Sequence, residues 1–182
     1  MILSDSEIKK NLVEGDIVIT PFQDKHLNPN SYDLTLGKNL MVYDFPTLSV
    51  KEKPQTRLLE IHPEKGFMLE PYEFYLGVTN EFTHIKKHVP MLEGKSSIGR
   101  LGLFVHITAG SGDVGFAGHW TVELFTVKPL RIFAGMRIAQ IIFHEVKGEV
   151  ERPYDLGGRY NNKFEENPFP MESQMYKNFI NG

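Results

Sequence analysis

Apolar and polar residues alternate in short runs along most of this chain, a pattern typical of β-strands rather than of helices. The runs are rich in β-branched and aromatic residues, and glycine, proline and asparagine separate them. Strands are therefore predicted over residues 17–20, 32–36, 67–69, 74–79, 89–93, 103–109, 120–127, 130–133 and 138–146. Many short strands with few helices predict a mainly β fold, closed into a barrel or packed as a sandwich.

One helix is predicted, at the start of the chain. Ser4 and Glu7 have the spacing of a capping box, in which each side chain bonds the backbone amide of the other residue. Leu3 and Ile8 are placed to pack against each other as a hydrophobic staple. We expect a short helix that runs to about residue 13 and ends at Gly15.

Two long segments lack the strand pattern. Residues 44–66 are rich in Pro, Lys and Glu and predict a long loop or an irregular hairpin, whereas Gly37 is expected to end the strand before it. From Lys147 the chain becomes polar and has little to bury. We therefore expect a β domain over residues 1–150 and a C-terminal tail over residues 151–182, which is either disordered or ordered by a partner or ligand.

Composition removes several classes of function. A length of 182 residues is most simply one domain, and a net charge of −3 argues against a broad nucleic-acid-binding face. The chain has no cysteine, which excludes disulfides and thiolate chemistry. No apolar run approaches the ~18 residues of a membrane span, and the first residues do not resemble a signal peptide. The sequence therefore predicts a cytoplasmic protein that binds neither membranes nor nucleic acids.

The segment 94–100 (GKSSIGR) combines donors suited to phosphate. Arg100 offers a planar fork of N–H groups, Ser96 and Ser97 offer hydroxyls, and the glycines expose backbone amides. The spacing is not that of a Walker A loop. The segment is either an anion site or an ordinary polar turn at the end of a strand.

Glu123 is a single carboxylate in an apolar strand. Alternation places Thr121, Glu123 and Phe125 on one face and Val122 and Leu124 on the other. If both faces are packed, burial would raise the pKa of Glu123 into the range useful for proton transfer. If the strand lies at a sheet edge, Glu123 is solvated instead.

Other polar residues are weaker candidates. Asp113 lies in a glycine-rich loop, where it is either a sugar or water ligand or a plain turn residue, and Gln140 bonds either a ligand or the core backbone. His84 and His88 share a face only on a helix, and their surroundings look extended. Cysteine and the H-x-E signature are absent, so if this chain deaminates a base, it does not use the zinc route of cytidine deaminases. No protein-bound metal is predicted.

Several motifs, in order, resemble the dCTP deaminase family, which is related to the trimeric dUTPases. They are residues 93–103 (EGKSSIGRLGL), 106–110 (HITAG), 113–116 (DVGF) and 121–124 (TVEL), with 28–34 (NPNSYDL) before them and the tail segments 152–154 and 159–160 after them. The resemblance covers most of the chain. It implies a distorted β-barrel or jelly roll of the dUTPase type, a mobile tail that closes over the nucleotide, and a homotrimer with active sites between subunits.

The resemblance also implies roles for individual residues. Glu123 would be the proton shuttle, Ser96 and the carbonyl of Ala109 would hold the attacking water, and Arg100 would balance the charge of Glu123. The remaining contacts to dCTP would come from Lys95, Ser96, Ser97, Ile98, Gly99 and Arg100 around the triphosphate, Asp113 at the sugar, Thr121, Val122 and Glu123 at the base, and Gln140, Tyr154, Arg159 and Lys163 elsewhere on the nucleotide. Arg159 stands where the family usually has a lysine, and Lys163 stands near the position of a usual glutamine.

The implied reaction is hydrolysis of dCTP to dUTP and ammonia, with Mg²⁺ bound through the triphosphate, no zinc, and dTTP as a candidate inhibitor. We expect dUTP as the main product, because Ser111 and Gly112 leave the loop at Asp113 without a bulky side chain to hold a second water in place. The alternative is a bifunctional enzyme that forms dUMP and pyrophosphate. A plain dUTPase is disfavoured because a glycine-rich terminal motif is absent, and a non-catalytic nucleotide-binding regulator is disfavoured because Glu123 is intact.

Overall fold

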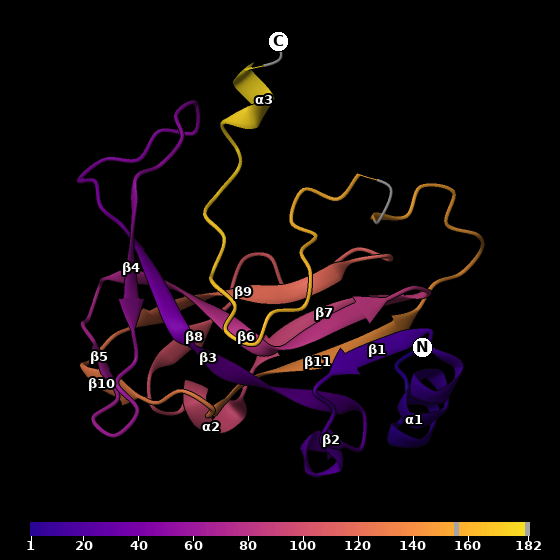
Figure 1. Ribbon diagram of the computed structural model, residues 1–182. Coiled ribbons are helices and arrows are strands. Elements are labelled where there is room, and N and C mark those ends of the chain that lie inside the picture. Colours follow the sequence, from indigo (N-terminus) through magenta and orange to yellow (C-terminus); the bar gives the residue numbers. More distant parts are fainter. Residues whose placement is uncertain (155–156, 181–182) are drawn as a thin grey trace.

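A computed structural model describes residues 1–154 and 157–180 (Figure 1). Within these residues one large antiparallel sheet has the strand order β7-β11-β3-β6-β9-β8, with β1 beside β6 and with β2 and β4 beside β3, while β5 and β10 form a small separate pair. The strands are β1 Ile17–Thr20, β2 Leu27–Asn28, β3 Ser31–Tyr43, β4 Thr56–Glu60, β5 Phe67–Leu69, β6 Phe74–Ile85, β7 His88–Gly94, β8 Leu103–Val105, β9 Ala117–Thr126, β10 Leu130–Ile132 and β11 Arg137–Glu145. The predicted mainly β fold is confirmed.

The sheet is nearly closed into a barrel, and a loop rather than a strand completes it. Residues 110–112 run antiparallel to β7: the Leu92 amide donates to the Gly110 carbonyl at 2.6 Å, and the Gly112 amide donates to the Pro90 carbonyl at 2.7 Å. These bonds satisfy the outer edge of β7, which would otherwise present unpaired backbone groups. The segment that follows β8 is therefore held on both sides.

The predicted N-terminal helix is confirmed as α1, Asp5–Glu14. The Glu7 amide donates to the Ser4 hydroxyl at 3.4 Å, and Gly15 ends the helix in the left-handed conformation with φ 76°. Leu3 and Ile8 are both buried, as the staple requires. The helix lies beside β1 at one side of the barrel (Figure 1).

The expectation that Gly37 ends a strand is wrong. β3 continues through this glycine to Tyr43, and its register with β6 shifts between Leu36 and Leu40. A Cβ on Gly37 would lie 3.1 Å from both a methyl group and the carbonyl oxygen of Val78, so glycine here allows two strands to approach closely. Of the two expectations for residues 44–66, the hairpin is confirmed, because β4 pairs with the end of β3.

The predicted strand over residues 103–109 is too long. β8 ends at Val105 because His106 adopts a positive φ of 51°, which turns the chain away from the sheet. Three short helical segments were not predicted: η1 Asp24–His26, α2 Ser96–Gly99 and α3 Lys177–Ile180. They span three or four residues each, too few for a helical period to show in the sequence.

The core fills the barrel with side chains from its inward faces, including fully buried Tyr32, Phe143, Leu34, Leu124 and Ile141. Among the described residues, no helix is long and apolar enough to cross a membrane. The face of β9 that carries Val122 and Leu124 belongs to this core, and the opposite face, with Thr121 and Glu123, is turned toward the C-terminal part of the chain.

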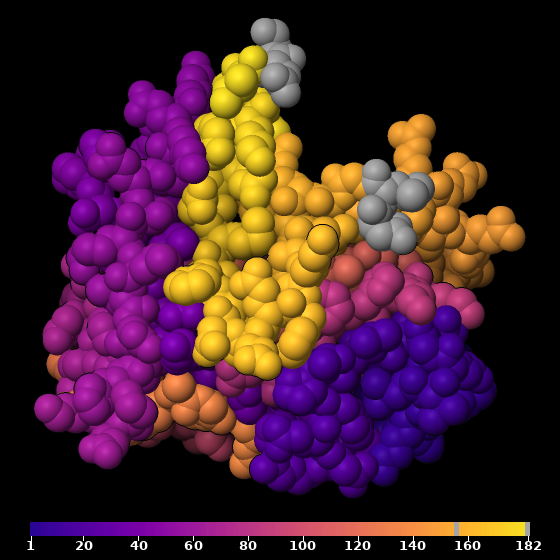
Figure 2. All heavy atoms as spheres, viewed as in Figure 1, coloured from indigo at the N-terminus to yellow at the C-terminus, as the bar shows by residue number. Residues whose placement is uncertain are grey.

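The C-terminal tail, which we define as the described residues from 151 onward, is seated on the barrel (Figures 1 and 2). β8 pairs only with the last part of β9, so the first part has a free edge. The side chain of Asn161 accepts from the Ala117 amide at 3.0 Å, and that of Asn162 accepts from the His119 amide at 2.9 Å. Two asparagine side chains thus occupy backbone positions that a neighbouring strand would fill. The mobility of the tail and its separation from the barrel at residue 151 stay predictions. Residues 155, 156, 181 and 182 of the predicted tail lie outside the described part of the chain.

Candidate active site

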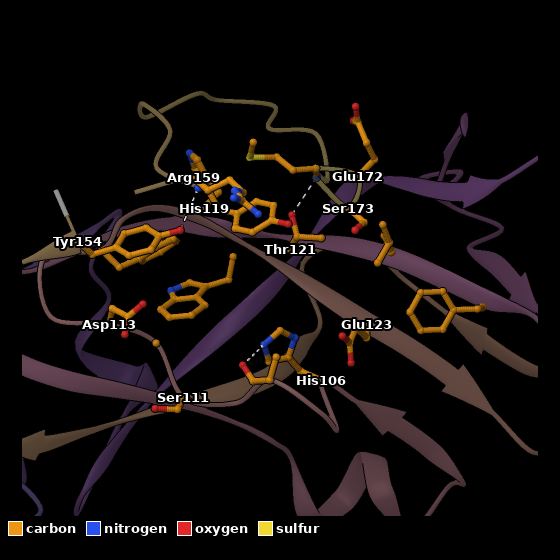
Figure 3. Close-up of a pocket in the computed structure, with 18 of the residues that line it drawn as sticks. His106, Ser111, Asp113, His119, Thr121, Glu123, Tyr154, Arg159, Glu172 and Ser173 are labelled. Carbon is orange, nitrogen blue, oxygen red and sulfur yellow. Dashed lines mark hydrogen bonds between the residues drawn. The ribbon is translucent and has the colours of Figure 1, made fainter. Parts of the chain in front are cut away.

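A cavity of about 720 Å³ lies between β9, the loop that follows β8, and the tail (Figure 3). Its volume is in the range of small-molecule sites, about 300–1,000 Å³. Its lining comes from β3, β6 and β9 (Tyr43, Phe74, Leu76, His119, Trp120, Thr121, Glu123), from residues 106–116 (His106, Ala109, Ser111, Gly112, Asp113, Phe116) and from the tail (Tyr154, Gly157, Arg159, Tyr160, Met171, Glu172, Ser173).

Glu123 lies in this cavity, half-buried, on a strand with neighbours on both sides. The alternation predicted for β9 holds: Val122 and Leu124 are buried, and Thr121 and Glu123 are on the cavity side. The Thr108 hydroxyl lies 3.2 and 3.1 Å from the two carboxylate oxygens of Glu123. The carboxylate is therefore oriented while one of its sides remains open to the cavity.

His106 lies in the same cavity as Glu123, and its surroundings favour the neutral imidazole. Burial lowers the pKa of its imidazole, more than the Glu123 charge and the bond to the Ala109 carbonyl raise it. Its Nε2 lies 2.8 Å from the Ala109 oxygen, and because a carbonyl only accepts, Nε2 carries the proton. The Ala109 carbonyl, expected to hold water, is thus bonded within its own loop, in the cavity that Glu123 also lines.

Asp113 is exposed, and the glycine before it is closely packed. A Cβ on Gly112 would lie 2.5 Å from the Trp120 ring and 2.9 Å from Pro90, so no larger residue fits there. Together with the two backbone bonds to β7, this packing fixes the loop without any bulky side chain of its own. Contacts with Trp120 and Pro90 thus stand where the sequence offers no bulky side chain to fix the loop.

Aromatic side chains form one wall of the cavity. The Phe116 and Trp120 rings lie 4.3 Å apart between centroids, and Tyr154 lies 6.1 Å from Phe116. The Trp120 indole donates to the Thr83 hydroxyl at 2.9 Å, which orients the ring. Such flat apolar surfaces suit a base or a sugar face.

The tail covers the opposite side of the cavity (Figure 3). The Met171 amide donates to the Thr121 hydroxyl at 2.9 Å, and the Ser173 amide donates to the Tyr43 hydroxyl at 3.1 Å. Glu172 pairs with Lys53 of the β3–β4 hairpin at 3.4 Å. Arg159 is exposed and donates to Asn178 at 2.6 Å.

The predicted anion segment lies outside this cavity: within the described chain, none of Lys95, Ser96, Ser97, Ile98, Gly99 and Arg100 lines it. Lys95 bonds the fully buried carboxylate of Asp33 at 2.5 Å, and Arg137 reaches the other oxygen of that carboxylate at 3.2 Å. Arg100 donates to the Ser96 hydroxyl instead of meeting Glu123. In one chain, therefore, the structure does not bring the proposed phosphate donors to the proposed catalytic carboxylate.

Three other predicted residues also stand apart. The Val122 side chain lies in the core, Gln140 accepts from Ser31 at 3.4 Å on β11, and Lys163 is exposed on the tail outside the cavity. The residues that the structure does bring together are Glu123, Ala109, Asp113, Thr121, Tyr154 and Arg159.

The structure adds residues that sequence analysis missed. His119 was predictable, because alternation along β9 puts it on the face of Thr121 and Glu123. Tyr43 and Glu172 carry no such signal, because they reach the cavity only through the pairing of the hairpin with the tail.

A family model described as dCTP deaminase-like matches residues 2–146. The chain belongs to the dCTP deaminase-like family. Similar proteins named "dCTP deaminase, dUMP-forming" occur in Clostridium acetobutylicum (51% identical, covering 100% of both chains), Clostridium botulinum (53%, covering 98% of this chain and 99% of that protein) and Leptospira biflexa (50%, 98% of each).

A solved structure has the same fold as the present chain. The 2′-deoxycytidine 5′-triphosphate deaminase from Agrobacterium tumefaciens matches with a TM-score of 0.64 at 19% identity, over 80% of this chain and 48% of that one. The chain thus spans about half of the length of that protein. The names of the closer relatives overturn the expectation of dUTP as the main product.

Proposed function

We propose that this protein is a bifunctional dCTP deaminase that converts dCTP to dUMP, ammonia and pyrophosphate. The observation that carries the proposal is the set of relatives named dUMP-forming deaminases, 49–53% identical over almost the whole chain. The cavity supports it with an oriented carboxylate, a fixed carbonyl and an aromatic wall in one place.

The first step needs a base beside a held water. Glu123 would take a proton from water, and the hydroxide would add to C4 of cytosine. Glu123 would then deliver this proton to N3. It would next take the proton of the new C4 hydroxyl and pass it to the amino group, so that the C4–N bond breaks, ammonia leaves and the C4 carbonyl of uracil forms. The Thr108 hydroxyl orients the carboxylate, and the Ala109 carbonyl faces the same space as an acceptor for the water.

The second step needs another water, placed in line with the α-phosphorus of dUTP. Its attack breaks the bond between the α-phosphorus and the bridging oxygen, and gives dUMP and pyrophosphate. Asp113 is the carboxylate that we propose to orient this water, because it stands on the loop fixed by Gly112 against Trp120. Precise water placement needs a loop that is held in position, and the packing at Gly112 supports this role.

The charge of the cavity supports a site completed by a second subunit. Its described lining holds three carboxylates, Asp113, Glu123 and Glu172, against one arginine, Arg159. A triphosphate carries several negative charges and needs more cationic donors than one. We propose that Lys95, Ser96, Ser97 and Arg100 of a neighbouring copy in a homotrimer supply them, and that dTTP competes for the same cavity.

Magnesium would be carried on the substrate. The described residues contain no group of three or more His, Cys, Asp or Glu that could hold a metal ion alone. We propose that the phosphate oxygens provide most of the magnesium ligands. Bound there, Mg²⁺ would neutralise charge on the triphosphate and on the leaving pyrophosphate.

A product time course tests the proposed function. The protein is incubated with dCTP and Mg²⁺, and ammonia, dUTP, dUMP and pyrophosphate are separated. We expect dUMP and pyrophosphate to appear in step with ammonia, without a pool of dUTP. Accumulating dUTP would contradict the bifunctional assignment, and absence of ammonia would contradict deamination altogether.

A further inference from the structure

His119 lies where the tail meets β9 (Figure 3). Both of its ring nitrogens lie within hydrogen-bond distance of backbone groups. The side chain is buried, with 4% of its surface exposed. Its Nδ1 lies 3.1 Å from the Thr79 carbonyl oxygen, and its Nε2 lies 3.0 Å from the Glu165 backbone nitrogen. One imidazole therefore links β6 to the tail across β9.

The two partners determine the protonation state of this ring. A carbonyl oxygen only accepts a hydrogen bond and a backbone amide only donates one, so Nδ1 must carry the proton and Nε2 must be bare. An imidazolium carries protons on both nitrogens, and the second proton would point at the Glu165 N–H. The contact between His119 and the tail thus exists only for one tautomer of the neutral ring.

We propose that His119 is a positioning residue that seats the tail over the cavity, and that its protonation releases this part of the tail. The consequence for substrate rests on the proposed function, because the tail supplies Arg159, Tyr160 and residues 171–173 of the cavity lining. We call the hydrogen bond between His119 and the Glu165 amide the seat of the tail. The seat does not depend on which nucleotide binds.

The surroundings of the ring favour the neutral form. Burial lowers the pKa of His119, more than the Thr79 hydrogen bond and the negative charge of Glu165 raise it. On β6 it faces the Phe82 ring at 5.7 Å, and on the tail the Phe164 ring at 5.8 Å, neither of which titrates. The other charged groups around the same cavity are Asp113, Glu123, Glu172 and Arg159.

The sign of the pH dependence follows from this lowered pKa. Because the seated state disfavours the proton, the seat is complete above the ordinary histidine pKa of about 6.5 and is lost as the pH falls through the lowered value. The neighbouring tail contacts use groups that do not titrate in this range: the side chains of Asn161 and Asn162 and the hydroxyl of Thr121. Among the described contacts of this stretch, those that acid can break are therefore the hydrogen bond of His119 with Glu165 and the ion pair of Glu172 with Lys53.

Hydrogen exchange of the ligand-free protein tests the seat without any activity. Protection of residues 161–173 is measured between pH 5 and pH 8 and corrected for intrinsic exchange, and the His119 pKa is measured by NMR in the same samples. For the wild type we expect protection of the Glu165 amide to fall by about five- to tenfold on acidification, the weight of one hydrogen bond. Protection that does not follow the His119 titration would overturn the proposal.

Two substitutions distinguish the seat from a general structural role. His119→Gln keeps an acceptor that can reach the Glu165 amide and does not titrate, so the protection should become independent of pH. His119→Asn keeps a donor for Thr79 but does not reach Glu165, so the protection should be low at every pH. Equal pH dependence in wild type and His119→Gln, with both folded by circular dichroism, would overturn the proposal.

Kinetics with dCTP then tests the consequence for substrate. The KM of the wild type for dCTP should rise as the pH falls below the His119 pKa, and the KM of His119→Gln should change less over the same range. The kcat values of the two proteins should have the same dependence on pH. The fluorescence of Trp120, the single tryptophan of the chain, gives an independent signal from the residue next to His119. If dCTP is not a substrate, the exchange result still decides whether the seat exists, so the two proposals fail separately.

Discussion

The Thr108 hydroxyl donates to the Glu123 carboxylate from within 3.2 Å of both of its oxygens. Thr108 stands on the loop after β8, whereas Glu123 stands on β9, and the His106 amide joins the same two segments by donating to the Glu123 carbonyl at 2.8 Å. The carboxylate is therefore oriented by its own subunit before any substrate arrives. Preorganisation of this kind lowers the reorganisation needed during proton transfer.

Replacing Glu123 by Gln should abolish ammonia release and leave dCTP binding within a few-fold of wild type. Gln keeps the size and an acceptor for Thr108 but removes the base. The control is Thr108→Val, which should keep Glu123 and lower kcat by roughly ten- to a hundredfold, because orientation and not the base is lost. Ammonia release and calorimetric binding of dCTP are the measurements. Substantial turnover by Glu123→Gln would refute the assignment of the base.

Replacing Gly112 by Val should damage the second step more than the first. A Cβ there meets the Trp120 ring at 2.5 Å, so the loop that bears Asp113 must shift, while Glu123 on β9 keeps its strand pairing. We expect a lower Tm and a pool of dUTP that the wild type does not form. Circular dichroism of the variant checks that the barrel still folds. If Gly112→Val still formed dUMP in step with ammonia, without a pool of dUTP, the loop would have no role in the second step.

The fold was largely predictable because alternation along single strands is a local property of the sequence. It identified α1, most strands and the cavity face of β9 with Glu123. The rest depends on contacts between distant segments. Gly112 closes the barrel only because Pro90 and Trp120 stand across from it, and the tail takes its place only because Asn161 and Asn162 match the free edge of β9. No pattern in a single segment carries either fact.

Asp33 should be the residue whose loss destabilises the barrel while leaving the Glu123 side of the cavity unchanged. Its buried carboxylate bonds Lys95, Arg137 and the Asn28 amide, so Asp33→Ala leaves two cations without their partner. We expect a loss of about 3 kcal/mol in the free energy of unfolding, the scale for breaking a buried pair. Urea unfolding measures it. The exposed pair of Lys9 and Asp24 is the control, and Asp24→Ala should cost less than about 1 kcal/mol. Equal costs for the two variants would contradict a structural role for Asp33.

Activity should persist when zinc is chelated and fall when magnesium is withheld. The chain contains no cysteine, and its described residues offer no cluster that could hold a catalytic metal alone, whereas the triphosphate needs a counter-ion. Turnover is measured with a zinc-selective chelator and, separately, with Mg²⁺ titrated against dCTP. Loss of activity with the zinc chelator, restored by added zinc, would show that the route through Glu123 and water alone is wrong.

Mixed subunits test whether Lys95–Arg100 of one copy serve Glu123 of another. Glu123→Gln and Arg100→Ala homo-oligomers should each be nearly inactive, because each lacks one half of every site. When the two variants are unfolded together and reassembled, a site formed between two subunits can combine an intact Glu123 from one with an intact Arg100 from its neighbour. Random assembly should restore roughly a quarter of the wild-type sites. If the active site lay within one chain, every site in the mixture would carry one of the two lesions, and activity would stay at the level of the separate variants. The position of Arg100, bonded to Ser96 and outside the cavity of its own chain, favours recovery.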